Sequence, residues 1–217
     1  MKTLTIQDLT FGWLEEPLLK QITAFLNPGD IVHLKGENGA GKTTLLKLIA
    51  GQIPHFTQGT LLSGDIHIGQ DSILTMPPGH FFPSIAFIPG RHIDFFLFTE
   101  NPEQEILVTK AISDSCLSEI ENRRIQFCDI FRSMNALRDT PYSIMTLAQK
   151  ALSLTYVYFL QGARLYLIDE AIPEFDHEWL SFFDLLRSDN ANMIFTCHQF
   201  KNNGLKTWVL KDGVLCS

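Results

Sequence analysis

The stretch Gly36-Glu37-Asn38-Gly39-Ala40-Gly41-Lys42-Thr43-Thr44 has the pattern G-x-x-x-x-G-K-[ST] of a phosphate-binding loop. An apolar run, Asp30–Leu34, precedes this loop, and a helical pattern, Leu45–Ala50, follows it. The order strand, loop, helix is the context in which such a loop binds phosphate. The sequence therefore predicts a P-loop fold organised around this segment.

The residue types of the loop suit phosphate chemistry. Glycines let the backbone curl until successive N–H groups point at phosphate oxygens, and the positive end of the following helix adds to that field. We expect Lys42 to reach the β- and γ-phosphates, and the Thr43 hydroxyl to complete the shell of a bridging Mg²⁺. The predicted nucleotide-binding residues of the loop are Gly36, Glu37, Asn38, Gly39, Ala40, Gly41, Lys42, Thr43 and Thr44.

Composition indicates one globular domain over residues 1–217. Hydrophobic residues make up 45% of the chain, which is enough to bury a sizeable core. The formal net charge is −7, and no run rich in Lys or Arg is present. A nucleic-acid partner held mainly by electrostatics is therefore not expected.

The chain shows no signs of secretion. Its four cysteines, Cys116, Cys128, Cys197 and Cys216, lie far apart without a C-x-x-C pair, which suits a reducing compartment. The N-terminus lacks the apolar core of a secretion signal. The uncharged apolar stretch Ala151–Ala163 is too short to span a bilayer. We expect a cytoplasmic protein that reaches a membrane only through partner subunits.

An aromatic residue near the N-terminus is a candidate for base stacking. Leu4–Leu9 alternates apolar and polar residues like a half-buried strand, and a turn is expected at Phe11–Trp13. Trp13 is placed to stack on an adenine face, with a gain of about 1–3 kcal/mol if base stacking is a fair guide. The alternative is an ordinary core or surface aromatic.

The middle of the chain changes character twice. Gly51 is expected to end the helix after the phosphate loop, and Ile53–Gly64 is expected to be a loop. Gly64–Gly69 and Ser84–Ile88 are then typical of short strands. Between about residues 91 and 146 glycine is absent and apolar residues recur at helical spacings, which predicts an inserted helical subdomain.

Two carboxylates mark the end of a later strand. After a helix expected over Leu147–Gln161, the apolar strand Arg164–Glu170 ends in Asp169 and Glu170. Ligands gather at the carboxyl ends of parallel strands, so Asp169 is expected to lie beside the phosphate loop. Asp169 would hold Mg²⁺ through water, and Glu170 would orient or deprotonate the attacking water.

A histidine ends the next strand. The run Ala191–His198 places His198 where its imidazole can donate a hydrogen bond to a γ-phosphate, although a lone histidine at a strand end is more often a structural hydrogen-bonder. The chain closes with Trp208–Leu215, a hairpin pattern around Asp212-Gly213.

The motifs, in this order, resemble the ATP-binding subunit of an ATP-binding-cassette (ABC) transporter over essentially the whole chain. Trp13 falls where that family carries its adenine-stacking aromatic, and Leu165–Glu170 matches its second phosphate-site strand. His198 matches its switch histidine, and Asp176 matches the aspartate of the loop that crosses the dimer interface. Gly51–Phe56 is similar to the corresponding segment of energy-coupling-factor ATPases. The resemblance implies an α/β P-loop core with a mostly parallel sheet, a small antiparallel N-terminal sheet and a helical subdomain.

Two positions depart from the family pattern. The family signature Leu-Ser-Gly-Gly-Gln aligns with Met145-Thr146-Leu147-Ala148-Gln149, so both glycines are replaced, and the lid glutamine aligns with Gly90. In this family two subunits close head to tail around two ATPs, each lying between one chain's phosphate loop and the other chain's signature. Loss of the signature glycines removes backbone donors from the partner's ATP. This favours an asymmetric heterodimer with a second ATPase over a homodimer that contains two damaged sites.

The resemblance implies ATP hydrolysis with Mg²⁺ that powers substrate translocation by integral membrane subunits at the inner face of the cell membrane. The implied catalytic residues are Lys42, Glu170 and His198, and the implied metal ligands are Thr43 and Asp169. One alternative is a nucleotide-gated regulatory or structural subunit with little hydrolysis of its own. Another is a soluble P-loop kinase, which would leave His198 and the order of the motifs unexplained.

Overall fold

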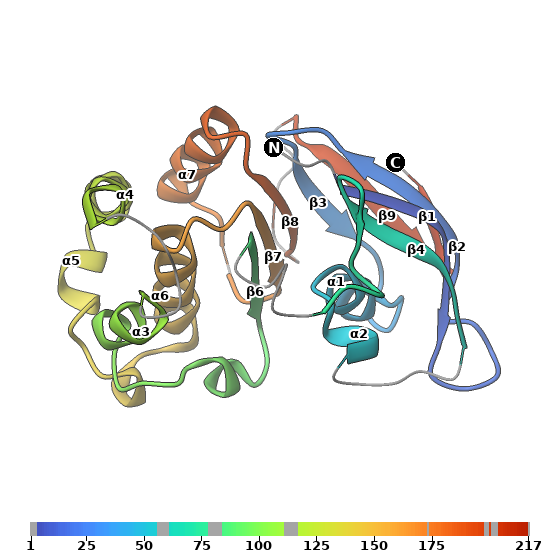
Figure 1. The fold of residues 1–217 in the computed structure, drawn as a ribbon, viewed down its shortest axis with the longest axis horizontal. Helices are drawn as coiled ribbons and strands as arrows, with labels where there is room; N and C mark the ends of the chain where they lie inside the picture. Colours follow the sequence, from blue (N-terminus) through green and yellow to red (C-terminus); the bar gives the residue numbers. More distant parts are fainter. Residues whose placement is uncertain are drawn as a thin grey trace.

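The computed structural model describes residues 4–55, 61–77, 84–110, 117–172, 174–197, 200 and 204–216. The fold class is the expected one, with a mostly parallel sheet, a smaller antiparallel sheet and a group of helices. Figure 1 shows the helices α3 to α6 at one end, the antiparallel sheet with α1 at the other, and β6, β7 and β8 between them.

The central sheet has the strand order β10-β9-β3-β8-β7-β6. The strands β3, β6, β7, β8 and β9 pair in parallel, and β10 is an antiparallel edge. Their bounds are β3 Ile31–Lys35, β6 Ile85–Pro89, β7 Leu165–Asp169, β8 Asn192–Thr196, β9 Lys206–Lys211 and β10 Val214–Cys216. Every residue of β6, β7 and β8 is buried, as expected for parallel strands covered on both faces. The predicted hairpin turn is present, since Asp212 and Gly213 both have positive φ.

Helices cover both faces of this sheet, because successive strand residues point to opposite sides. On β7, Leu165 and Leu167 pack with α1 (Lys42–Ile49), whereas Tyr166 and Ile168 pack with α6 (Leu147–Leu160) and α7 (His177–Ser188). The helix predicted over Leu147–Gln161 is α6. The helix α7 was not predicted.

The antiparallel sheet has the order β2-β1-β4-β5, with bounds β1 Leu4–Gly12, β2 Leu19–Leu26, β4 Leu61–Ile68 and β5 Asp71–Ser72. The turn expected at Phe11–Trp13 is wrong at its start, because Phe11 pairs with Leu19 of β2 and Leu62 of β4. Pairing on both sides keeps β1 extended to Gly12. The strand β2 was not predicted.

The loop expected over Ile53–Gly64 is also wrong where the structure describes it. A short helix, α2 (Gln52–His55), follows Gly51, and β4 already begins at Leu61. Residues 56–60, which include Phe56, lie outside the described residues. Gly64 lies inside β4, opposite a bulge of β1 at Asp8 and Leu9, and is not a strand boundary. Its φ is 80°, and a Cβ there would lie 2.4 Å from the Gln7 carbonyl oxygen. Cross-strand pairing with β1 therefore extends the strand through a glycine.

The segment after β6 is helical. It contains η3 (Ile93–Phe96), α3 (Pro102–Lys110), α4 (Leu117–Ile130), α5 (Met134–Leu137) and η4 (Tyr142–Ile144). The Phe127 ring of α4 lies 5.6 Å from that of Phe159 on α6 and 5.4 Å from that of Phe182 on α7. Edge-on and tilted ring contacts of this kind add to the hydrophobic burial. The helical part is thus joined to the core by shared aromatic packing.

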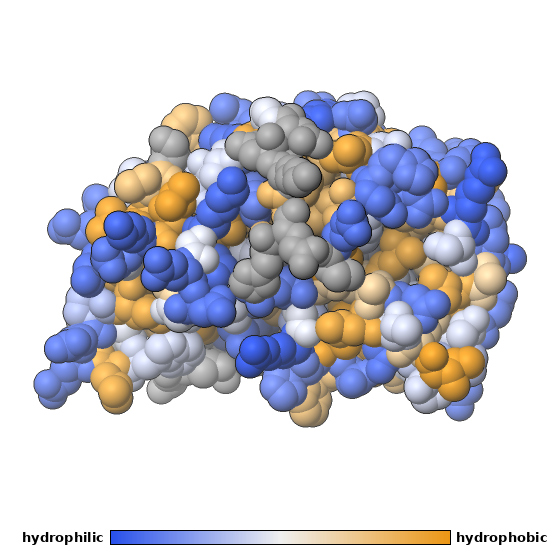
Figure 2. Space-filling view, turned by 180° about the vertical axis from the view of Figure 1, so that it is seen from behind, coloured by the Kyte–Doolittle hydropathy of each residue, from blue (hydrophilic) through white to orange (hydrophobic). Residues whose placement is uncertain are grey.

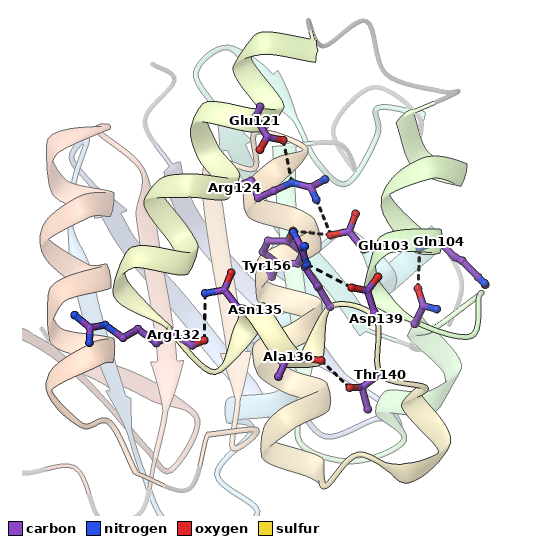
Figure 3. A network of polar contacts seen from close by, with 12 residues as sticks. Glu103, Gln104, Glu121, Arg124, Arg132, Asn135, Ala136, Asp139, Thr140 and Tyr156 are labelled. Carbon is purple, nitrogen blue, oxygen red and sulfur yellow. Dashed lines mark hydrogen bonds and ion pairs between the residues drawn. The ribbon is translucent and has the colours of Figure 1, made fainter.

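A polar network ties three of these helices together (Figure 3). Arg124 of α4 donates to Glu103 Oε1 of α3 at 2.9 Å, and the Tyr156 hydroxyl of α6 donates to the same oxygen at 3.0 Å. Burial, followed by the charge of Glu103, raises the pKa of Tyr156, so this hydroxyl stays protonated and remains a donor. Arg124 also pairs with Glu121 at 3.2 Å. Glu103 is therefore the shared acceptor of the network.

No helix within the described part of the chain has both the length and the apolar character needed to cross a bilayer.

We expect Glu103→Ala to destabilise the fold by about 1–3 kcal/mol, because it leaves the Tyr156 hydroxyl and part of the Arg124 guanidinium without their acceptor. For a domain of this size, each kcal/mol should lower the Tm by roughly 2–4 °C. Thermal unfolding followed by circular dichroism measures the shift. Glu121→Ala is the matched control, since its side chain is 61% exposed and its loss should cost less than about 1 kcal/mol. Equal losses for the two variants would contradict the role of Glu103.

Candidate functional site

A hollow of about 710 Å³ opens at the carboxyl end of the central sheet. The phosphate loop and the start of α1 form one wall, and the ends of β6 and β7 form another. Among the predicted site residues, the lining includes Asn38, Gly39, Gly41, Lys42, Thr43, Thr44, Asp169 and Glu170. The structure therefore brings together the loop and the two carboxylates, which are far apart in the sequence.

The phosphate loop leaves the start of α1 open. Gly41 is the N-cap of α1 in the left-handed conformation, and no side chain caps the helix. Within the loop, the Ala40 N–H donates to the Glu37 carbonyl at 3.2 Å. The first N–H groups of a helix need an acceptor, and a phosphate oxygen is a suitable one. The local fold thus presents backbone donors where an anion is expected.

The Lys42 ammonium lies inside this loop. Its Nζ donates to the carbonyl oxygens of Gly36 at 2.9 Å and Glu37 at 3.1 Å, and it lies 3.9 Å from Glu170 Oε1. Lys42 is 8% exposed. Two neutral carbonyls and one distant carboxylate compensate its charge only in part. A phosphate entering the loop would therefore meet a strong attraction at Lys42.

Asp169 and Thr43 meet across the hollow. The Thr43 hydroxyl donates to Asp169 Oδ2 at 2.7 Å, and the Thr196 hydroxyl donates to Oδ1 at 3.2 Å. Burial raises the pKa of Asp169, the hydrogen bonds from Thr43 and Thr196 lower it in part, and the nearby Glu170 raises it. A hydroxyl and a carboxylate are the hard oxygen ligands that Mg²⁺ prefers, so the pair fits a Mg²⁺ completed by water and phosphate oxygens.

Glu170 adopts an unusual backbone conformation directly after β7. Its φ is 54°, in the left-handed region that non-glycine residues rarely occupy. Its N–H donates to the Thr196 hydroxyl at 2.8 Å, so Thr196 bridges the Glu170 backbone and the Asp169 carboxylate. Sequence reasoning did not single out Thr196. The signal was available, since Thr196 is the last residue of a strand that ends at the same edge.

Several other predicted residues lie elsewhere. Trp13, on the loop between β1 and β2, is 39% exposed and packs edge-on against Phe11 at 4.9 Å, and it does not line the hollow, whereas Leu18 does. The Asp176 carboxylate caps α7 by accepting from the N–H groups of Glu178 and Trp179. His198 lies outside the described residues. Adenine stacking by Trp13 and a catalytic role for His198 stay predictions.

The residues that align with the family signature surround the start of α6 and do not line the hollow. Thr146 is the N-cap, and it forms a reciprocal capping box with Gln149. Leu147 is 45% exposed. Both polar side chains therefore cap the helix, and an apolar side chain stands exposed beside them.

Gly90 follows β6 in a place where no side chain fits. A Cβ there would lie 2.4 Å from the Asp169 carbonyl oxygen and 2.7 Å from that of Glu170. Both contacts are with backbone, so a larger residue would have to displace one of the two strand ends. The next residue, Arg91, is exposed and lines the hollow, and sequence reasoning did not single it out.

Known proteins resemble the chain in sequence and fold. Residues 19–173 match the sequence profile of the family described as ABC transporter. The cytochrome c biogenesis ATP-binding export protein CcmA of Legionella pneumophila (strain Lens) is 29% identical over 208 residues, which cover 90% of this chain and 92% of that protein. The maltose/maltodextrin import ATP-binding protein MalK of Escherichia coli (strain K12) is 34% identical over 116 residues, 49% of this chain and 30% of that protein.

A solved structure described as the ATP binding subunit of an ABC transporter superposes with a TM-score of 0.79 at 20% identity, covering 98% of this chain and 87% of that one. A second, the ADP conformation of the ATP-binding cassette MJ1267, gives a TM-score of 0.76 at 16% identity and covers 100% of this chain and 90% of that one. At these identities the likeness establishes the fold.

We expect Asp169→Asn to stabilise the nucleotide-free protein at pH 8, because it removes a buried charge. A raised pKa in the folded state means that Asp169 favours folding when protonated and that this contribution is lost as pH rises through the folded pKa. The gain in Tm, roughly 2–4 °C for each kcal/mol relieved, should therefore shrink toward acid pH. Thermal scans at several pH values test this, with exposed Asp184→Asn as control. A lower Tm at pH 8 would contradict it.

We expect Gly90→Gln, which introduces the residue that the family resemblance predicts at this position, to lower the free energy of unfolding by a few kcal/mol, since its Cβ would press on two backbone carbonyls. Arg91→Gln introduces the same side chain one residue later at an exposed position, and it should leave the Tm nearly unchanged. Unfolding scans of both variants make the comparison. A Gly90→Gln protein as stable as wild type would show that the strand ends separate easily.

Proposed function

The chain belongs to the ABC transporter family, and we propose that it binds ATP with Mg²⁺ in the hollow and hydrolyses the ATP to drive a membrane transporter. The proposal rests on two contacts between the phosphate loop and the end of β7. Lys42 Nζ lies 3.9 Å from Glu170 Oε1, and the Thr43 hydroxyl lies 2.7 Å from Asp169 Oδ2. Family membership sets the soluble-kinase alternative aside.

Each residue has a proposed task in hydrolysis. The loop backbone and Lys42 bind the phosphates, while Thr43 and Asp169 are the residues that would hold Mg²⁺. When bound, this ion would balance the phosphate charge. Glu170 orients a water for in-line attack and accepts its proton as the bond to the γ-phosphorus forms and the bond to the leaving ADP oxygen breaks. His198 donates a hydrogen bond to the γ-phosphate in this scheme.

An asymmetric pair of ATPases is the arrangement that we favour. Leu147 presents an exposed apolar side chain at the start of α6, and the Gln149 side chain accepts from Thr146 within the capping box. Leu147 offers no donor to a phosphate of a facing subunit, and the Gln149 side chain is held by its oxygen within the capping box. A partner with an intact signature would serve this chain's own phosphate loop, while the site opposite this chain's signature would be weaker.

Integral membrane subunits complete the proposed assembly, which would place the chain on the cytoplasmic side of the membrane. Phe95 is 77% exposed and Phe98 79% exposed, both on the segment between the hollow and α3. Exposed aromatics on an ordered segment are typical of interaction surfaces. On the face seen in Figure 2, hydrophobic side chains form separate patches with hydrophilic residues between them.

Purification from gently solubilised native membranes tests the assembly. We expect this chain to be recovered with a polytopic membrane protein and a second ATPase that has an intact signature, identified by mass spectrometry. Within that complex, Glu170→Gln should lower ATP hydrolysis by about 100-fold or more and leave ATP binding intact, since Gln keeps the shape but cannot accept a proton. Glu178→Gln, at a half-buried position in the first turn of α7, is the control and should match wild type.

Two outcomes would change the proposal. Full turnover by this chain alone would contradict the heterodimer. The second outcome is an intact complex that binds ATP but hydrolyses it slowly, with no further loss in the Glu170→Gln variant. This outcome would favour the nucleotide-gated subunit with little hydrolysis. The exposed Leu147 is the observation that keeps this second candidate in view.

A further inference from the structure

The central sheet contains a buried titratable side chain that the proposed reaction does not use. His33, on β3, is 2% exposed. It pairs with Phe195 of β8 on one side and with Thr207 of β9 on the other. The strand β3 leads at Lys35 directly into the phosphate loop. His33 therefore lies beneath the loop, between the strand that ends at Thr196 and the last parallel strand.

The imidazole contacts the chain just beyond the end of β8. Its Nε2 lies 3.2 Å from the Cys197 carbonyl oxygen. Its ring stacks on Phe195 with 4.9 Å between ring centroids and 3° between the planes. It also meets Phe200 edge-on at 5.2 Å and 90°. His33 thus contacts the backbone one residue before position 198, the predicted switch histidine, and an aromatic ring two residues after it.

The contacts select one tautomer of His33. A carbonyl oxygen only accepts, so Nε2 carries the hydrogen and donates it. The buried Nδ1 has no hydrogen-bond partner among the described residues, so a second hydrogen there would be unsatisfied. Burial lowers the pKa of His33, the hydrogen bond to the Cys197 carbonyl raises it in part, and the charge of Lys35 lowers it further. The neighbouring groups on β8 and beyond it are two phenyl rings and the Cys197 carbonyl, and the residue facing His33 on β9 is Thr207.

The hydrogen bond from His33 to the Cys197 carbonyl orients the backbone just beyond β8. A carbonyl lies in the same planar peptide group as the nitrogen of the next residue, so holding the Cys197 oxygen orients the peptide that enters His198. The ring contact with Phe200 adds a second constraint on the far side. His33 is itself on the strand that leads to the phosphate loop. Its contacts with Cys197 and Phe200 therefore link the chain on either side of position 198 to that loop.

We propose that His33 is a positioning residue, which through its Nε2–H bond to the Cys197 carbonyl holds the chain entering His198 in register with the phosphate loop. This inference rests on the proposed function, because it concerns the efficiency of hydrolysis. Both the neutral imidazole and the imidazolium can donate from Nε2, but the imidazolium would add a hydrogen at the buried Nδ1, with nothing to accept it among the described residues. Hydrolysis should therefore fall at acid pH, below the ordinary titration range of histidine.

Three variants in the native complex test the proposal. His33→Phe keeps a flat ring against Phe195 but has no donor. His33→Gln places an amide N–H close to the position of Nε2 and does not titrate. Tyr166→Phe is the matched control, because it removes a buried hydroxyl, without a hydrogen-bond partner among the described residues, from β7, the strand on the far side of β8. The readouts are kcat and KM for ATP between about pH 5.5 and 8.5, with thermal unfolding to confirm folding.

The expected result is a roughly 3- to 10-fold lower kcat for His33→Phe, with the KM for ATP within about twofold of wild type. His33→Gln should keep most of the kcat and lose the acid limb of the wild-type profile. Tyr166→Phe should match wild type. In ¹⁵N-labelled protein, the ring nitrogen shifts of His33 should report the neutral Nε2–H form.

Specific results would overturn the proposal. Equal kcat for His33→Phe and Tyr166→Phe would mean that the donor is not used. Equal loss in His33→Phe and His33→Gln would assign the effect to packing, and an Nδ1–H form in the spectrum would remove the bond itself. A wild-type complex without ATPase activity is a different result, since it would overturn the proposed function and this inference with it.

Discussion

The Thr43 hydroxyl and the Asp169 carboxylate lie 2.7 Å apart, although 126 positions separate them in the chain. Their contact requires β3 and β7 to end at the same edge of one sheet, with β8 between them. Parallel pairing satisfies this requirement, because every parallel strand delivers its following residues to the same edge. The Thr196 hydroxyl at the end of β8 donates to the same carboxylate. The strand order is thus the constraint on which the site depends, and the helices on both faces keep that order buried.

The residues that form the site also lower the stability of the fold. Asp169 is a buried carboxylate with a raised pKa, and Glu170 holds a backbone conformation that most residues avoid. Each of these features costs stability, and the surrounding core must offset the cost. Tyr166 and Ile168 on one face of β7 and Leu165 and Leu167 on the other are buried in two hydrophobic clusters. The residues that seat Asp169 are therefore among the most buried of the chain, as expected if packing secures a strained site.

Local signals in the sequence predicted the parts of the fold that local signals determine. The phosphate loop, the apolar strand before Asp169 and the hairpin at Asp212-Gly213 each carry their own pattern. The strand β2 and the start of β4 exist because they pair with β1, a long-range contact without a strong local pattern. Gly90 shows the same limit at the site. From the sequence it reads as a missing glutamine, whereas in the structure it is a close backbone contact with Asp169 and Glu170.

The close packing at Gly90 also bears on how the helices connect to Glu170. The segment after Gly90 is attached to the helices by Asp94, which pairs with Lys150 at 2.6 Å, and by Glu105, which accepts from the Phe98 and Thr99 N–H groups. At its other end Gly90 packs on the carbonyls of Asp169 and Glu170. A side chain at position 90 would sense the site through a flexible contact, whereas backbone packed against backbone has little room to slip. Both ends of this segment are thus held, one by backbone packing on Asp169 and Glu170 and the other by the polar contacts of Asp94 and Glu105.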